Sequence, residues 1–206
     1  PAEFEVTVEV SGDAATPIAP VAWAVHTGSN PFVAGEMGRL AGLEALAEDG
    51  DPSGVASGLN ELDRVKHHGV AAIPDGASAA GPATPGHSYS FTVSASEGQR
   101  LSFATMYVQS NDLFYSPGAD GLALWDMSEP KSGDVTSRIM LYDAGTEHNE
   151  RPGQGANQPP RQSGPNTGPS EDRPVRLISD VNDGFSYPST GSVITVTINP
   201  ADSMGM

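Results

Sequence analysis

Acidic side chains lie in two short segments, each of which follows a strand-like run of apolar residues. The first segment, Ser110–Tyr115, contains Asp112, and the second, Leu141–Glu147, contains Asp143 and Glu147. An Ala-Gly pair between the last two acids permits a tight turn that returns Glu147 toward Asp143. Ca²⁺ takes about six to eight oxygen ligands from carboxylates, carbonyls and water. We therefore predict a calcium site between two loops of a β-sandwich, with a binding or structural role rather than a catalytic one.

Three further groups are weaker candidates for the same ion: Asn111, Glu150 and the backbone carbonyl of Tyr142. The alternative interpretation is that Asp112 and Asp143 only cap turns, which is a common use of aspartate. Three acids in two segments favour the metal, because carboxylates held together without a cation repel and raise one another's pKa.

No catalytic constellation can be named in the sequence. The chain has no Gly-x-Ser-x-Gly nucleophile motif, no phosphate-binding loop and no histidine pair at helical spacing. Acids are plentiful, but nothing in the sequence selects the opposed carboxylates of a glycosidase. The tandem His67-His68 is interpreted as part of a surface loop, and His148 as a loop residue. We therefore expect a protein that is not an enzyme.

Two adjacent aromatic residues, Phe114 and Tyr115, end the first acidic segment. One hypothesis is that they form a surface for a partner or a sugar beside the cation loop. The alternative, which we favour, places one ring in the core and the other at its rim.

The charge of the chain limits its partners. There are 26 acidic and 10 basic side chains among 206 residues, and the formal net charge is -16. Such a charge repels phosphate, so we expect no nucleic acid partner and no docking on anionic membranes. An acidic chain whose only lysines are Lys66 and Lys131 is also typical of a halophilic protein that stays soluble in high salt.

Two further absences concern the compartment. Cysteine is absent, so there is no disulfide framework. No apolar run approaches the ~20 residues of a membrane-spanning helix, so we expect no membrane insertion. The chain begins at Pro1 rather than Met. We interpret it as a mature product whose leader has been removed, located outside the cell or at its surface.

Residue periodicity indicates many short strands. Apolar and acidic residues alternate in Glu3–Val10, which predicts a strand with Phe4, Val6, Val8 and Val10 facing the core. Apolar spacing predicts a helix over 36–47, and an Asp-Pro pair begins a second short helix over 51–62. We expect further strands at 21–25, 88–93, 101–109, 121–125, 138–142, 175–179 and 192–199, and an irregular loop at 151–174.

These elements predict one domain spanning residues 1–206, with its core at about 4–199. It is mainly β, an antiparallel β-sandwich with one or two short helices in the 36–62 region. The 24 glycines and 18 prolines agree with many turns. A loop as long as 151–174 is usually functional or packed across the surface.

Five blocks of residues occur in the same order as in a known family: Ala24–Gly28, Leu43–Gly50, Met106–Tyr115, Ser132–Thr136 and Tyr142–Glu147. From about Phe4 to Ile198 the chain resembles the spondin N-terminal-type domain, in particular its secreted bacterial and archaeal versions. The resemblance implies a C2-like β-sandwich with calcium bound between loops at one end. The implied ligand positions correspond here to Asp112, Asp143 and Glu147. The animal domain is a non-enzymatic part of matrix and adhesion proteins, and this chain lacks its cysteines.

The leading functional expectation is a secreted, calcium-binding β-sandwich that acts as an extracellular structural or adhesion module. Its partners would be further copies of itself, or a matrix or surface polymer. A sharper version is a self-assembling fibre or surface-layer subunit, in which the strand with Phe4, Val6, Val8 and Val10 adds to a neighbour's sheet. The alternative for that strand is pairing within its own domain. The alternative function is a non-catalytic, calcium-dependent module that binds carbohydrate or protein.

Overall fold

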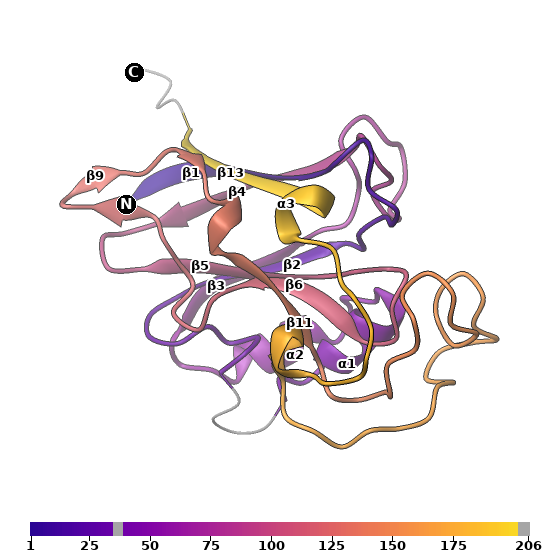
Figure 1. Ribbon diagram of the computed structural model, residues 1–206. Coiled ribbons are helices and arrows are strands. Elements are labelled where there is room, and N and C mark those ends of the chain that lie inside the picture. The colour runs from indigo at the N-terminus through magenta and orange to yellow at the C-terminus, as the bar shows by residue number, and fades with distance from the viewer. Residues whose placement is uncertain (35–38, 202–206) are drawn as a thin grey trace.

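The computed structural model describes residues 1–34 and 39–201 and contains two antiparallel β-sheets that face each other (Figure 1). Strands hold 35% of the residues and helices 12%, so the predicted mainly-β sandwich is confirmed. No helix in the described residues is long and apolar enough to cross a membrane.

The first sheet has four strands in the order β10-β13-β1-β4. Its central strand β1 buries the predicted residues Phe4, Val6, Val8 and Val10 completely, because alternate side chains of a strand point to the same face. The strands of this sheet are β1 (Ala2–Val10), β4 (Ser88–Ala95), β10 (Gly133–Asp134) and β13 (Ile194–Pro200).

The position of β1 corrects the strand-exchange hypothesis. β1 pairs with β13 on one side and with β4 on the other, in registers that run along most of its length. Its backbone groups therefore have partners inside the chain, and its apolar face is part of the core. The segment is not a free edge that could add to a neighbour's sheet, so the alternative of pairing within the domain describes this structure.

The second sheet has seven strands along the path β12-β11-β6-β5-β2-β3, with β7 paired to β5 beside this path. His67 and His68 lie in its edge strand β3 and not in a loop as expected. The strands are β2 (Val21–His26), β3 (Val65–Ala71), β5 (Arg100–Met106), β6 (Leu113–Pro117), β7 (Leu122–Ala123), β11 (Ile139–Asp143) and β12 (Arg176–Leu177).

Two helices cover the outer face of the seven-stranded sheet (Figure 1). Helix α1 (Leu43–Asp49) and helix α2 (Val55–Asn60) pack apolar side chains against Ala22, Ala104 and Phe114 of the sheet. Both helices were predicted in the 36–62 region, but each is shorter than expected. Residues 36–38 of the first predicted helix lie outside the described residues. A larger core fills the space between the two sheets.

The connections contain only short elements. They are the hairpin of β8 (Trp125–Asp126) with β9 (Glu129–Pro130), the 3-10 turns η1 (Thr136–Arg138) and η2 (Ile178–Asp180), and helix α3 (Thr190–Val193). Residues 151–174 contain no helix and no strand, which agrees with the predicted irregular loop. This loop lies at the same end of the sandwich as α1 (orange in Figure 1).

Candidate metal centre

The two predicted acidic segments meet because their strands are neighbours. β11 and β6 are antiparallel, and Asp143 at the end of β11 is opposite Leu113 at the start of β6. Asp112 directly precedes β6, and Glu147 follows β11 after a short turn. The loop before one strand and the loop after the other therefore lie together at one end of the sheet, as the sequence predicted.

Asp112 is completely buried, and only one of its two carboxylate oxygens has hydrogen-bond partners. Its Oδ2 accepts hydrogen bonds from the backbone N–H groups of Thr146 at 2.7 Å and Glu147 at 3.1 Å, and from Thr146 Oγ1 at 3.1 Å. Its Oδ1 has no hydrogen-bond partner among the described residues. Burial raises the pKa of Asp112, and the nearby Asp143 carboxylate raises it further. Buried polar groups are normally paired, so this oxygen requires an explanation.

Glu147 is 2% exposed and is held in place by the long loop. Its Oε1 accepts a 2.7 Å hydrogen bond from the Gly168 N–H, and its Oε2 accepts a 3.3 Å bond from Asn111 Nδ2. Burial raises the pKa of Glu147, while these two donors lower it. A Cβ at Gly168 would overlap the Glu147 carboxylate, so this close approach requires glycine.

Asp143 is as deeply buried as Asp112, but it is paired with the cationic side chain of Arg176. Its Oδ1 accepts a 2.7 Å bond from the Gly145 N–H, and its Oδ2 contacts Asn149 Nδ2 at 2.7 Å and Arg176 Nη2 at 3.3 Å. Burial raises its pKa, and Arg176 opposes that rise. A metal ion would therefore compete with Arg176 for Asp143, whereas Asp112 has no such partner.

Glu48 belongs to the same cluster, although it was not among the predicted ligands. It lies in α1, is 3% exposed, and its Oε1 has no hydrogen-bond partner among the described residues. Burial raises its pKa to about 7; the Thr146 side chain lowers it, while the carboxylates of Glu147 and Asp112 raise it. The sequence signal for this position was the acidic run from Glu48 to Asp51, which by itself is most simply a solvated turn after a helix.

The weaker candidates have other roles. Asn111 Oδ1 accepts hydrogen bonds from the Glu150 N–H at 2.9 Å and from Gln158 Nε2 at 3.1 Å, while Glu150 Oε2 accepts one from the Asn157 N–H at 2.9 Å. Gln158 is fully buried and was missed, since a single amide in an irregular segment has no recognisable pattern. Tyr142 lies within β11, paired with both neighbouring strands rather than in the loop.

Phe114 and Tyr115 do not form a ligand surface, which corrects that hypothesis. Both side chains are 0% exposed, since every residue of β6 is buried. Phe114 stacks on Tyr142 under the helices, with ring centroids 5.7 Å apart, and Tyr115 packs between the sheets against Tyr107. Adjacent strand residues point to opposite faces, and here both faces of the sheet are covered.

The argument for a cation site rests on buried oxygens without hydrogen-bond partners, and not on a set of ligands already arranged around an ion. Across residues 1–34 and 39–201, no group of three acidic or histidine side chains could hold a metal as it stands. Asp112 and Glu48 nevertheless each present a buried oxygen without a partner, and Thr146 lies beside both carboxylates. Glu48 also lines a pocket of about 270 Å³ together with Glu44. Carboxylates, carbonyls and water are the donors that Ca²⁺ prefers.

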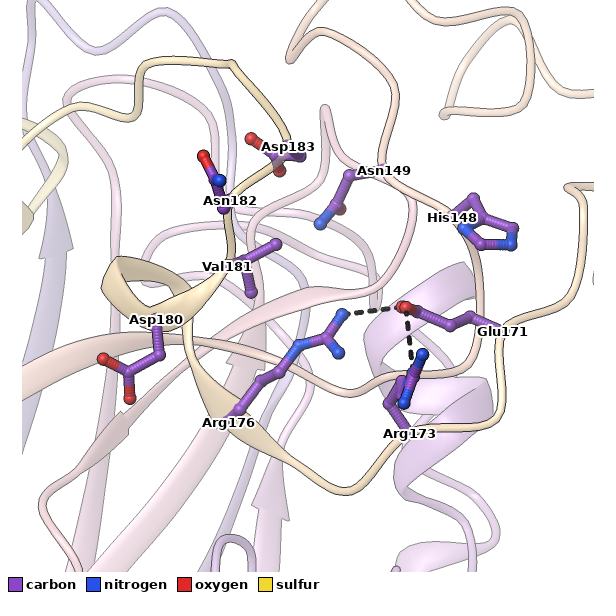
Figure 2. A pocket seen from close by; sticks show the side chains of 9 residues that line it. All are labelled: His148, Asn149, Glu171, Arg173, Arg176, Asp180, Val181, Asn182 and Asp183. Atoms are coloured by element: carbon purple, nitrogen blue, oxygen red, sulfur yellow. Dashed lines mark hydrogen bonds and ion pairs between the residues drawn. The ribbon is translucent and has the colours of Figure 1, made fainter.

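A second pocket, of about 360 Å³, is lined by Asn149 and Arg176, both of which contact Asp143 (Figure 2). Arg176 Nη2 bonds Glu171 at 2.7 Å beneath Asn149, and the Arg176 Nε has no partner within the described residues. The lining groups include both signs of charge and uncharged amides: His148, Asn149, Glu171, Arg173, Arg176 and Asp183.

Comparison with known proteins identified no relative: no protein-family model matches the chain, and no curated protein matches it. The resemblance to the spondin N-terminal-type domain therefore stays a prediction.

Proposed function

We propose that this protein binds Ca²⁺ at the buried cluster of Asp112, Glu48 and Glu147 and acts as a secreted, non-catalytic structural or adhesion module. The observation that carries the proposal is the unpaired Oδ1 of the fully buried Asp112. Glu48, whose carboxyl group interacts electrostatically with Asp112, also has an unpaired buried oxygen. A buried carboxylate without a partner is costly. A divalent cation would supply the missing charge, and backbone carbonyls and water would complete its coordination.

The proposed ion would connect three parts of the chain. Glu48 comes from α1, Asp112 from the loop before β6, and Glu147 from the loop after β11, which in turn contacts Gly168 of the long loop. Because Ca²⁺ would bind the folded cluster and not the unfolded chain, it would add stability by mass action, about 3 kcal/mol at a concentration ~100-fold above Kd.

The test is thermal unfolding at pH 8 in calcium and in EGTA. We expect wild type to melt at a higher temperature in calcium, and Asp112→Asn to lose this difference. Asp112→Asn should also be at least as stable as wild type in EGTA, because it removes a buried charge. Asp13→Asn, which changes an exposed acid, is the matched control. Equal melting of wild type in both solutions would reject the metal and favour carboxyl groups kept neutral by protons.

The extracellular part of the proposal follows from the resemblance to the spondin N-terminal-type domain and agrees with the acidic composition. Extracellular calcium is abundant enough to fill sites of only 10⁻⁴–10⁻³ M affinity, roughly the range of extracellular calcium modules. Immunodetection of the native protein in medium, cell-surface and cytoplasmic fractions tests it. Recovery in the cytoplasmic fraction alone would reject secretion.

A second candidate function is calcium-dependent binding of a polar ligand such as a saccharide in the pocket of Figure 2. The specific observation is that Asn149, which lines this pocket, also donates to Asp143 beside the cluster. The pocket has donors and acceptors of both charge signs, which suit neutral hydroxyl groups. A glycan array with and without EGTA tests this function, with Asn149→Ala as the pocket variant. No binding in either solution would remove it.

A further inference from the structure

The edge strands of the two sheets differ in how well they are protected from pairing with another chain. In the described residues, β10 and β12 are only two residues long, and β3 contains Lys66 and a register shift against β2. Short length, lysine and irregular pairing are the usual protections of an edge. β4 has none of them: it is eight residues long, uncharged, free of proline and continuously paired with β1.

The outer backbone groups of β4 are available from Ser90 onward. The carbonyl of His87 accepts from Val10 of β1, whereas the carbonyl of Ser88 points outward and accepts from Asp75 at 2.8 Å. Since the direction alternates along a strand, Ser90, Thr92 and Ser94 also point their N–H and C=O groups outward. No backbone hydrogen bond reaches these outer groups from the described part of the chain, and Thr92 and Ser94 are exposed.

We propose that β4 pairs antiparallel with β4 of a second copy of this chain, about a twofold axis at Thr92. This register places Thr92 opposite itself and Ser90 opposite Ser94 of the second copy, so hydroxyl side chains face hydroxyl side chains. On the inner face it places Phe91 opposite Val93. Isologous pairing of this kind is the commonest form of self-association.

The uncharged, self-complementary composition of β4 selects a second copy as the occupant. Each copy has a net charge of -16, so two copies can approach only where carboxylates are sparse. β4 is the only edge strand longer than two residues, within the described chain, that has no charged side chain. This edge also carries apolar surface: within each copy Phe91 stacks on Trp23 of the other sheet, with centroids 5.7 Å apart, and both rings are partly exposed.

The same register makes association depend on salt. Asp75 Oδ2 accepts hydrogen bonds from Ser88 and Ser90, so its carboxylate lies beside the first half of β4. Glu97 follows the other end of the strand. The twofold axis brings Asp75 of one copy toward Glu97 of the other. Salt screens this repulsion over about 3 Å at 1 M, against about 10 Å at 0.1 M. Association should therefore strengthen in molar salt, and it does not depend on the calcium proposal.

Cross-linking tests the register directly, because the chain has no cysteine of its own. Thr92→Cys should form a disulfide-linked dimer under mild oxidation in 2 M NaCl. Ser94→Cys is the matched control on the same strand, because it would face Ser90 of the second copy and not itself. Disulfides need Cα atoms within about 7 Å, so we expect roughly ten-fold more covalent dimer from Thr92→Cys. Equal dimer yields from the two variants would overturn the proposal.

Sedimentation velocity at 0.1 and 2 M NaCl tests association without a cross-link. Wild type should shift from monomer toward dimer as salt increases. Thr92→Lys should stay monomeric, since it places two cations face to face, whereas Val70→Lys on the other edge strand should behave as wild type. A wild type that is monomeric in both salts contradicts the proposal, as does a Thr92→Lys dimer. Circular dichroism of each variant confirms that it is folded.

Discussion

The two ends of the seven-stranded sheet bury ionisable groups of opposite type: carboxyl groups at one end and a histidine at the other. At one end, Asp112 and Glu48 are buried carboxyl groups with unpaired oxygens and raised pKa values. At the other end, where His26 pairs with Arg100, the His26 imidazole is completely buried, and burial lowers its pKa to about 4. The His26 Nε2 lies 2.8 Å from Ser102 Oγ, and Arg64 and Arg100 further disfavour its protonation.

This difference indicates which end needs a ligand. A histidine becomes neutral by losing a proton, so burial at neutral pH leaves no charge to compensate. A carboxyl group at the same pH must either take up a proton or find a cation. The histidine end therefore has no charge to compensate, although its Nδ1 also lacks a hydrogen-bond partner among the described residues, whereas the carboxyl groups of the acidic end require a proton or a cation. The predictions below test this contrast from the largest expected effect to the smallest.

Without Arg176, Asp143 should become a buried carboxylate that lacks a neighbouring cation, as Asp112 already does. In Arg176→Met, the 0% exposed Asp143 carboxylate loses its cation, and we expect a loss of about 3–4 kcal/mol of unfolding free energy at pH 8. The loss should be smaller at pH 5, where Asp143 can take up a proton. Denaturant unfolding measures both values. Arg173→Met is the control, because that side chain is 65% exposed and should contribute less than about 0.5 kcal/mol. Similar losses in the two variants would contradict the role of Arg176.

His26 should make the protein less stable in acid. Its folded pKa of about 4 lies below its ordinary 6.5, so the unfolded chain binds the proton more tightly. Its contribution is therefore complete above pH 6.5 and is lost as pH falls toward 4, by up to ~3 kcal/mol at 1.36 kcal/mol per pKa unit. Carboxyl groups with raised pKa values change the stability in the opposite direction as pH falls. The effect of His26 is therefore isolated by comparing wild type with His26→Gln.

Unfolding free energies from pH 4 to 7 measure this effect. The wild type should lose more stability than His26→Gln on acidification, and His67→Gln, at an exposed position, should follow wild type. Parallel curves for wild type and His26→Gln would mean that His26 is not kept neutral by the fold.

Gly168 should be sensitive to a single added methyl group. A Cβ there overlaps the Glu147 carboxylate, so Gly168→Ala must displace either the long loop or Glu147. We expect a loss of about 2 kcal/mol and a smaller rise of the melting temperature in calcium, which differential scanning fluorimetry can measure. Gly164→Ala, in the same loop with nothing within 4 Å of the added Cβ, should melt as wild type does. An unchanged calcium response in Gly168→Ala would separate Glu147 from the proposed site.

Local patterns in the sequence identified most of the longer strands, but not β3 or β6. The alternation in β1 identified its buried face residue by residue, since the two faces of a strand differ in every second side chain. The same reasoning failed for His67 and His68, because an edge strand that is exposed on both faces has no alternation to detect. It failed for Phe114 and Tyr115 for the converse reason, as both faces of β6 are covered.

The sequence by itself determined the mainly-β class, the acidic surface charge and the two segments that contain Asp112, Asp143 and Glu147. The tertiary structure alone decided that Glu48 joins them, that Arg176 neutralises Asp143, and that Asp112 keeps an unpaired oxygen. The physical reason is distance along the chain. Strand and turn preferences act between neighbouring residues, whereas the charge balance of a buried group depends on side chains brought from α1, β12 and the long loop.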